Sequence, residues 1–281
     1  MRVLALAAAL MPAAIWAQAP AKPPEVVNVT LHQYEDGPSV PAGNRFLPGE
    51  TVFISFQIRG YSVSPEGKVL LTYRIEAVDP DGAPVIEVES GRVETELTSQ
   101  DKDWLPKVRH SVLIPPHALP GEFRITALVR DGRTMLDAKA EAVFNVQGRA
   151  VDTSGPFAVK NVRFFRSEED QTPMAEPAYR PGDAFWARFD ITGFKSGEKN
   201  RIEVLYGISI VSPSGKVLFS EPEAALEEDS SLFYPRRHVP GVFSLTVQPR
   251  TTPGEYTLVI TVRDLVGEQT CETRGTFRVE P

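Results

Sequence analysis

The sequence predicts an all-β fold of two tandem antiparallel β-sandwich domains that follow a cleaved signal peptide. One observation is a repeat at an offset of 133 residues: PGE at positions 48–50 returns as PGD at 181–183, and VRD at 129–131 returns at 262–264. Another is that 25 prolines and 20 glycines separate short stretches of alternating apolar residues, which is typical of all-β chains. Because solenoid repeats are about 20–50 residues long, this offset indicates two complete domains.

Length and charge limit the classes of function. The chain has 281 residues, enough for two domains that each bury a core. Its formal net charge is −7, whereas binding to phosphate backbones requires a basic face. We therefore expect no nucleic-acid partner, and no binding to an anionic membrane surface. The short basic cluster at 236–238 (RRH) is expected to be a solvated turn.

The N-terminus has the pattern of an export signal. Arg2 precedes an apolar run that ends near Trp16, and small residues follow at 17–19. Residues 1–19 are interpreted as the signal peptide, with cleavage after Ala19 or after Ala17, and residues 20–25 as a proline-rich linker. No other segment is apolar enough to span a membrane. The mature chain is expected in the periplasm or outside the cell.

Strands are predicted in the same order in both units, which are placed at residues 26–147 and 157–281 and joined by a linker at 148–156. The first unit has alternating stretches at 26–34, 51–58, 68–78, 108–114, 123–129 and 138–146, and the second repeats them. Alternation puts every second side chain on one face. The expected core face of the second stretch is Val52, Ile54, Phe56 and Ile58, matched in the second unit by Phe185, Ala187, Phe189 and Ile191.

Turns and divergent segments separate these strands. The sequences DPDG at 79–82 and SPSG at 212–215 favour type I turns between two antiparallel strands, because proline already has the required φ. The segments 94–104 and 221–234 are polar and poorly periodic, and they differ most between the units. A helical turn is expected at 222–228.

This pattern resembles the immunoglobulin-like β-sandwich group in its bacterial forms, with fibronectin type III-like and macroglobulin-like domains among the subfamilies left open. The resemblance rests on the PGE entry to a long strand, the DPDG-type turn and a terminal F-x-V strand. Unlike true immunoglobulin domains, the chain has one cysteine and carries Tyr73 and Tyr206 where a tryptophan is usual. Tyr256 occupies the place of a tyrosine-corner residue, but its counterpart is Phe123.

No reactive constellation is preserved by the repeat, so we expect a protein that is not an enzyme and holds no metal or cofactor. The four histidines lack ligand spacing. Cys271 is expected to be a core residue of the last strand, in phase with Phe277. Gly267 begins a GEQ run that resembles part of a thioester motif, but Val266 stands where that motif needs its cysteine. The acidic turn at 79–81 is interpreted as solvated surface.

Aromatic residues are the candidate interaction residues. Phe53 and Trp186 are equivalent positions on the outward phase of their strands, and Phe233 and Tyr234 lie in the divergent segment of the second unit. The alternatives are that a loop or the neighbouring domain covers the first pair, and that the second pair packs against the linker. The sequence favours a binding or spacer module of the cell envelope with a protein or glycan partner. A carbohydrate-binding module and an accessory or inhibitor domain of an envelope enzyme are the other hypotheses.

Overall fold

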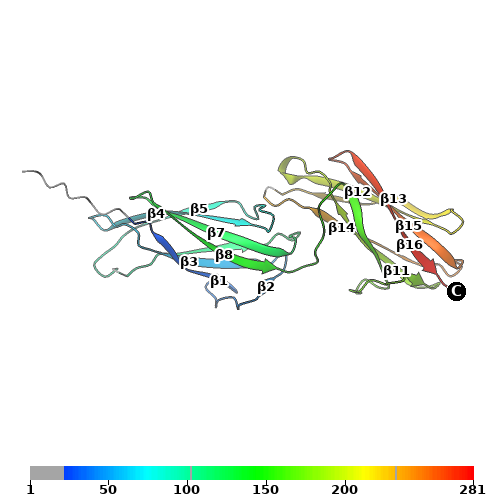
Figure 1. Ribbon diagram of the computed structural model, residues 1–281, viewed down its shortest axis with the longest axis horizontal. Coiled ribbons are helices and arrows are strands. Elements are labelled where there is room, and N and C mark those ends of the chain that lie inside the picture. Colours follow the sequence, from blue (N-terminus) through cyan, green and yellow to red (C-terminus); the bar gives the residue numbers. More distant parts are fainter. Residues whose placement is uncertain (1–21, 102, 232) are drawn as a thin grey trace, which may run out of the picture.

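A computed structural model describes residues 22–101, 103–231 and 233–281 of the chain, so the expected signal peptide at 1–19 lies outside the described residues. The chain forms two halves that lie end to end along its long axis (Figure 1), and each half contains two β-sheets. The predicted all-β fold of two tandem β-sandwich domains is confirmed. Within the described residues no helix is long and apolar enough to cross a membrane.

The first domain packs a three-stranded sheet against a five-stranded one. The small sheet has the order β1-β3-β6, and the large sheet has the order β2-β8-β7-β4-β5. Their bounds are β1 Glu25–His32, β2 Arg45–Phe46, β3 Thr51–Arg59, β4 Lys68–Val78, β5 Glu89–Glu96, β6 Lys107–Leu113, β7 Gly121–Asp131 and β8 Asp137–Val146.

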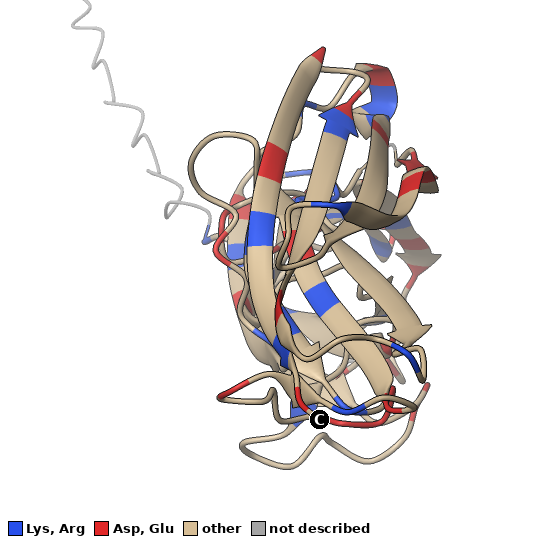
Figure 2. Ribbon diagram, turned by 90° about the vertical axis from the view of Figure 1, so that its right-hand side faces the viewer, with Lys and Arg blue, Asp and Glu red and all other residues tan. Residues whose placement is uncertain are grey.

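The second domain repeats this topology, with sheets of order β14-β11-β9 and β10-β16-β15-β12-β13. Its elements are β9 Ala158–Phe165, β10 Ala178–Tyr179, β11 Ala184–Thr192, the 3-10 turn η1 Glu198–Asn200, β12 Ile202–Val211, β13 Val217–Asp229, β14 His238–Thr246, β15 Gly254–Asp264 and β16 Gln269–Val279. Acidic and basic residues are interspersed along the strands in the view of Figure 2.

The core lies between the two sheets of each domain. Every predicted inward residue of β3 and of β11 is at most 2% exposed. Tyr73 and Tyr206 pack edge-on against Phe56 and Phe189, at centroid distances of 6.4 and 5.4 Å. Apolar burial contributes about 25 cal/mol per Å², so these alternating side chains hold the sandwich together without a disulfide.

Register is preserved between the domains as well as topology. His32 lies opposite Phe53 on β1 and β3, and Phe165 lies opposite Trp186 on β9 and β11. A bulge interrupts β1 near Asn28 and β9 near Asn161, and these two asparagines have φ values of 52° and 54°. Asparagine tolerates this left-handed conformation better than most residues. Positions 133 residues apart are therefore structurally equivalent.

A buried aspartate organises the same corner of both domains. Asp131 accepts hydrogen bonds from Ser62 N and Oγ and from Arg133 N, and Asp264 accepts them from Lys195 N and Gly267 N. Both residues are 1% exposed. Burial opposes ionisation, but these hydrogen bonds hold the pKa of Asp131 below its usual range. The repeated VRD motif thus encodes a carboxylate that ties two loops together.

The two predicted turns are confirmed, whereas the helical turn expected at 222–228 is not. The turns at 79–82 and 212–215 join the antiparallel pairs β4–β5 and β12–β13, and Tyr256 donates to Thr252 O at 2.7 Å as a tyrosine corner does. The helical turn expected at 222–228 is wrong, because these residues belong to strand β13. β13 is an edge strand, and edges often carry charges and proline instead of apolar alternation.

The segment between the domains is attached to the second one. Arg149 makes a bidentate pair with Asp190, whose side chain is fully buried, and Lys160 binds the Asp152 carboxylate at 2.8 Å. Burial raises the pKa of Asp190, but Arg149 and Asn161 hold it below its usual range. A short segment pinned in this way restricts how freely the domains can turn.

Candidate functional site

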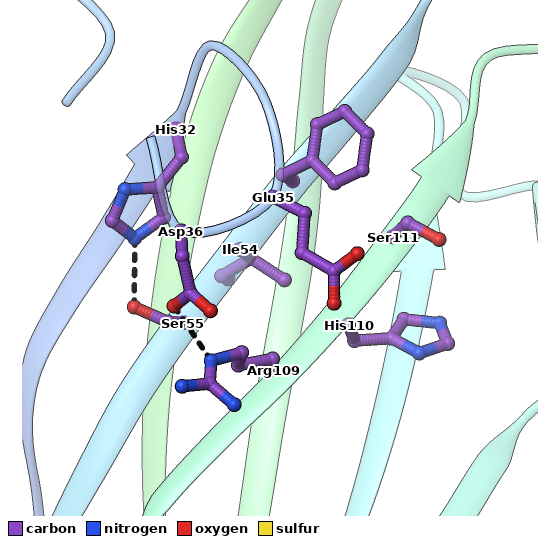
Figure 3. Close-up of a pocket in the computed structure, with 9 residues that line it drawn as sticks. His32, Glu35, Asp36, Ile54, Ser55, Arg109, His110 and Ser111 are labelled. Carbon is purple, nitrogen blue, oxygen red and sulfur yellow. Dashed lines mark hydrogen bonds and ion pairs between the residues drawn. The ribbon is translucent and has the colours of Figure 1, made fainter. Parts of the chain in front are cut away.

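A hollow opens on the outer face of the small sheet of the first domain (Figure 3). The loop after β1, residues 33–38, folds back across β3 toward β6 and forms one side of it. The hollow has a volume of about 260 Å³. Its lining residues come from β1, that loop, β3 and β6, and they are His32, Glu35, Asp36, Phe53, Ile54, Ser55, Arg109, His110 and Ser111.

His32 and Ser55 form the floor of the hollow. His32 Nε2 and Ser55 Oγ are 2.7 Å apart, and His32 Nδ1 is 2.7 Å from the carbonyl oxygen of Gly37. The arrangement has the order of a nucleophile, a base and an orienting group. However, Ser55 is 5% exposed and lies mid-strand, opposite Thr30 of β1 and Arg109 of β6. Its backbone is thus part of the sheet, which favours a structural role for the pair.

Asp36 pins the loop to the edge strand β6. Its carboxylate accepts hydrogen bonds from Lys107 Nζ at 2.9 Å and from Arg109 Nε at 2.6 Å. Lys107, followed by Arg109, holds the pKa of Asp36 below its usual range. The pair is exposed, so its contribution to stability is small. Its consequence is geometric, because it fixes where the loop lies over the sheet.

Glu35, His110 and Ser111 border the other side of the hollow. In Figure 3 the Glu35 carboxylate points toward the side where Ser111 and His110 lie. His110 is half-buried, and burial lowers its pKa although Glu89 opposes this shift. His110 is paired with the core residue Ile54, so its ring lies on the inner side of the sheet. This side of the hollow therefore offers a carboxylate from Glu35 and a hydroxyl from Ser111, a mixture of hydrogen-bond acceptors and donors.

The equivalent place in the second domain is occupied. Phe165 and Arg188 stand where the first domain has His32 and Ser55. The Arg188 guanidinium lies 4.3 Å from the centre of the Phe165 ring, and Phe165 is 2% exposed. Arg188 also donates to the carbonyl oxygens of Glu168 and Asp170. Each domain thus anchors its first loop with an arginine, but only in the first does that arginine, Arg109, come from the edge strand.

The first pair of aromatic candidates separates into two environments. Phe53 lines the hollow, and Trp186 lies beside Phe165 at the occupied place. Both side chains are partly exposed. The two equivalent rings therefore have different neighbours: Phe53 lies opposite His32, and Trp186 lies opposite Phe165.

The second pair of aromatic candidates, Phe233 and Tyr234, differs in exposure. Phe233 is partly exposed, whereas Tyr234 is 6% exposed and belongs to the apolar cluster of the first domain. Arg237 lies over the Tyr234 ring at 5.4 Å and pairs with Asp79 and Asp81 of the first domain. Tyr234 is thus a contact between the domains, and its ring is not open to an external ligand.

This junction corrects two expectations. The acidic turn at 79–81 is not all solvated surface, because the Asp79 side chain is fully buried against Arg237. The basic cluster at 236–238 is not a solvated turn, because the Arg236 and Arg237 side chains are only 10% and 18% exposed. Both errors have one physical reason: ion pairs cover groups that would otherwise face solvent. Arg237 pairs with Asp79 and Asp81 across the junction. Arg236, in contrast, pairs with Glu227 and Asp229 within the second domain.

The remaining candidates have structural surroundings. Cys271 is partly buried against the core of the second domain, and burial raises the pKa of its thiol. Gly267 lies in the turn between β15 and β16, where its N–H binds Asp264. Within residues 22–101, 103–231 and 233–281, no group of three or more His, Cys, Asp or Glu side chains is placed to hold a metal ion.

Sequence reasoning missed most of the hollow. Among its residues the sequence singles out only Phe53 as an interaction candidate, and it raises His32 and His110 solely as possible metal ligands. One signal was available: at equivalent positions the units differ in chemistry, with His32 against Phe165, Ser55 against Arg188 and Arg109 against Val242. Such differences on a matched scaffold mark where the domains have specialised.

Comparisons with known protein families and with curated proteins found no match. Solved structures gave distant likenesses. The C-terminal domain of the Streptococcus agalactiae AgI/II polypeptide BspA is 12% identical, with a TM-score of 0.31, and the match covers 92% of this chain and 100% of that one. The C-terminal domain of the Streptococcus pyogenes antigen I/II-family protein AspA is 9% identical, with a TM-score of 0.31, and the match covers 93% and 100%.

A Salmonella alpha-2-macroglobulin is 12% identical, with a TM-score of 0.30, and the match covers 84% of this chain but 16% of that one. With TM-scores this low, none of these likenesses bears on what the chain binds.

Proposed function

We propose that this chain is an exported, non-enzymatic binding module of the cell envelope, with domains at residues 26–147 and 157–281 joined by a linker at 148–156. Its contact surface is the hollow beneath loop 33–38 of the first domain. One observation carries the proposal: the two domains share topology and register, yet the hollow is open in one and occupied by Arg188 on Phe165 in the other. Loops on a rigid scaffold are where binding groups usually lie.

The surroundings of Ser55 support a binding role over a catalytic one. An acyl-transfer site needs free backbone N–H groups aimed at a developing oxyanion, and a strand between two partners uses its N–H groups in the sheet. Ser55 lies between β1 and β6 in this way and is 5% exposed. His32, held by Gly37 O, then serves to fix the loop.

The scaffold suits presentation of this surface to a partner. The hollow rests on a sheet and on a loop anchored by Asp36, so little ordering is needed when a partner binds. Its rim carries both signs of charge, with Glu35 and Asp36 from the loop and Arg109 from β6. A protruding polar group of an envelope protein or of a glycan fits such a surface.

Photo-cross-linking tests the proposal with a matched control. A benzoylphenylalanine replaces Phe53 in one variant and Trp186 in another, and each protein is irradiated with an envelope fraction. We expect a discrete cross-linked species from position 53 and none from position 186, because only the first ring lines the hollow. Equal cross-linking from both positions, or cross-linking from position 186 alone, would contradict the proposal.

A further inference from the structure

The size of the hollow restricts what it can take. Sites for drug-sized ligands measure about 300–1,000 Å³, and this one measures about 260 Å³ and is open on one side. It therefore accommodates one ring-sized group that stays attached to something larger. An extended peptide segment would need a groove along the strands, whereas loop 33–38 crosses them.

The charges around the hollow nearly cancel. Glu35 and Asp36 bring two carboxylates, and Arg109 and Lys107 bring two cations, of which Asp36 already binds both. The free carboxylate of Glu35 would repel an anionic group, and the guanidinium of Arg109 would repel a cationic group. A neutral polar group meets neither repulsion, so the charges around the hollow favour an uncharged ligand.

The hydrogen-bonding groups are of mixed type. Glu35 only accepts, Arg109 only donates, and Ser111 does both. A ligand that matches them carries several groups that donate and accept at once, as vicinal hydroxyls do. Phe53 lines the same hollow and supplies an apolar surface, which suits the C–H-rich face of a sugar ring.

We propose that the hollow binds a neutral sugar ring, such as the terminal hexose of a glycan. The idea rests on the proposed function, since it names the ligand class of the same surface. In this arrangement Glu35 and Ser111 bind ring hydroxyls, Phe53 contacts the face of the ring, and Arg109 donates from β6 while it still holds the loop through Asp36.

A glycan array followed by calorimetric titration with the best neutral oligosaccharide tests the idea on the chain from residue 22 onward. The variants are Glu35→Gln and Phe53→Leu, and the controls at equivalent places are Glu168→Gln and Trp186→Leu. We expect Glu35→Gln to weaken binding about tenfold or more, because it removes a hydrogen bond to a charged group. Phe53→Leu should also weaken binding, because it removes the flat aromatic contact with the ring. The controls should bind like the wild type. Glu35 is exposed, so its substitution leaves the fold intact.

Two outcomes would overturn the sugar assignment. Binding confined to sialylated or sulfated glycans would show that the ligand is anionic, and binding that neither hollow variant weakens would place the sugar elsewhere. A third outcome separates the two proposals: with no glycan bound but a protein cross-linked from position 53, the sugar assignment fails while the proposed binding function stands. If no glycan binds and no protein is cross-linked from position 53, both the sugar assignment and the proposed binding function fail.

Discussion

Arg237 of the second domain closes over the buried carboxylate of Asp79 in the first. The guanidinium also pairs with Asp81 and lies 5.4 Å from the ring centre of Tyr234. A second pair crosses the junction, since His117 Nε2 of the first domain lies 3.5 Å from the Asp229 carboxylate of the second. Asp79 also caps its own turn, accepting from Asp81 N and Ala83 N. Asp79 Oδ1 is therefore satisfied within its own turn, whereas Asp79 Oδ2 gains its cation, Arg237, only when the domains dock.

Removal of Arg237 should destabilise the first domain. Arg237→Ala leaves the buried Asp79 carboxylate without its cation, which costs about 3–5 kcal/mol in comparable buried pairs. Asp79→Ser installs the residue that the second domain has at this position, Ser212, and should restore part of the loss when added to Arg237→Ala. Urea unfolding followed through Trp104, in a Trp186→Phe background, measures both changes. An exposed pair of the same domain supplies the control, since Arg59→Ala should cost under about 1 kcal/mol.

Tyr234 should contribute through its ring and not through its hydroxyl. Among the described residues its hydroxyl has no hydrogen-bond partner, and burial raises its pKa to about 12. Tyr234→Phe should therefore leave stability unchanged or slightly higher. Tyr234→Ala should cost about 3 kcal/mol, as loss of a buried aromatic ring does. The same Trp104 unfolding assay distinguishes them, and a large loss from Tyr234→Phe would show that the hydroxyl is bonded.

The repeated buried aspartates should be equally important in each domain. Asp131→Ala leaves the N–H groups of Ser62 and Arg133 without an acceptor and should cost about 3 kcal/mol in the first domain only. Asp264→Ala should do the same in the second, reported by Trp186. Since the folded pKa of Asp131 is lowered, its stabilisation is complete above the unfolded pKa and is lost as pH falls through the folded value. Asp137→Asn, at an exposed pair, is the control and should change little.

The stability of the protein should fall in mild acid. Burial lowers the pKa values of His110, His117 and His238. The unfolded chain then binds more protons than the folded one below about pH 6.5, the ordinary histidine value. The contribution is complete above that pH and is lost as pH falls toward the folded values. Urea unfolding at pH 7.5 and 5.5 measures this, and His238→Phe should lose less stability than the wild type between the two.

The thiol of Cys271 should react slowly. The residue is partly buried against the second core, and burial raises its pKa, so little thiolate is present at pH 7. A thiol reagent should label the native protein many times more slowly than the urea-unfolded chain. Rapid stoichiometric labelling of the folded protein would show that the last strand opens readily.

Repeated turns and alternation predicted most of the fold because both are local. The inward side chains of β3 and β11, such as Phe56 and Phe189, follow from periodicity alone. β13 was missed because an edge strand with Pro222 has neither pattern. The burial of Tyr234 could not be predicted, since its neighbours come from the other domain. His32 meets Ser55 across two strands, and that contact depends on a register which a single sequence does not fix.

The most direct test gives the first domain the chemistry of the second. His32→Phe combined with Ser55→Arg should place an arginine over a phenylalanine ring, as Arg188 lies over Phe165, and occupy the hollow without disturbing the sheet. The reciprocal variant, Phe165→His with Arg188→Ser, is the matched control. With the partner captured from position 53 as the probe, equilibrium binding should weaken about tenfold or more in the first variant and stay unchanged in the second. Unchanged binding by the folded first variant, or equal losses in both, would contradict a binding surface at this hollow.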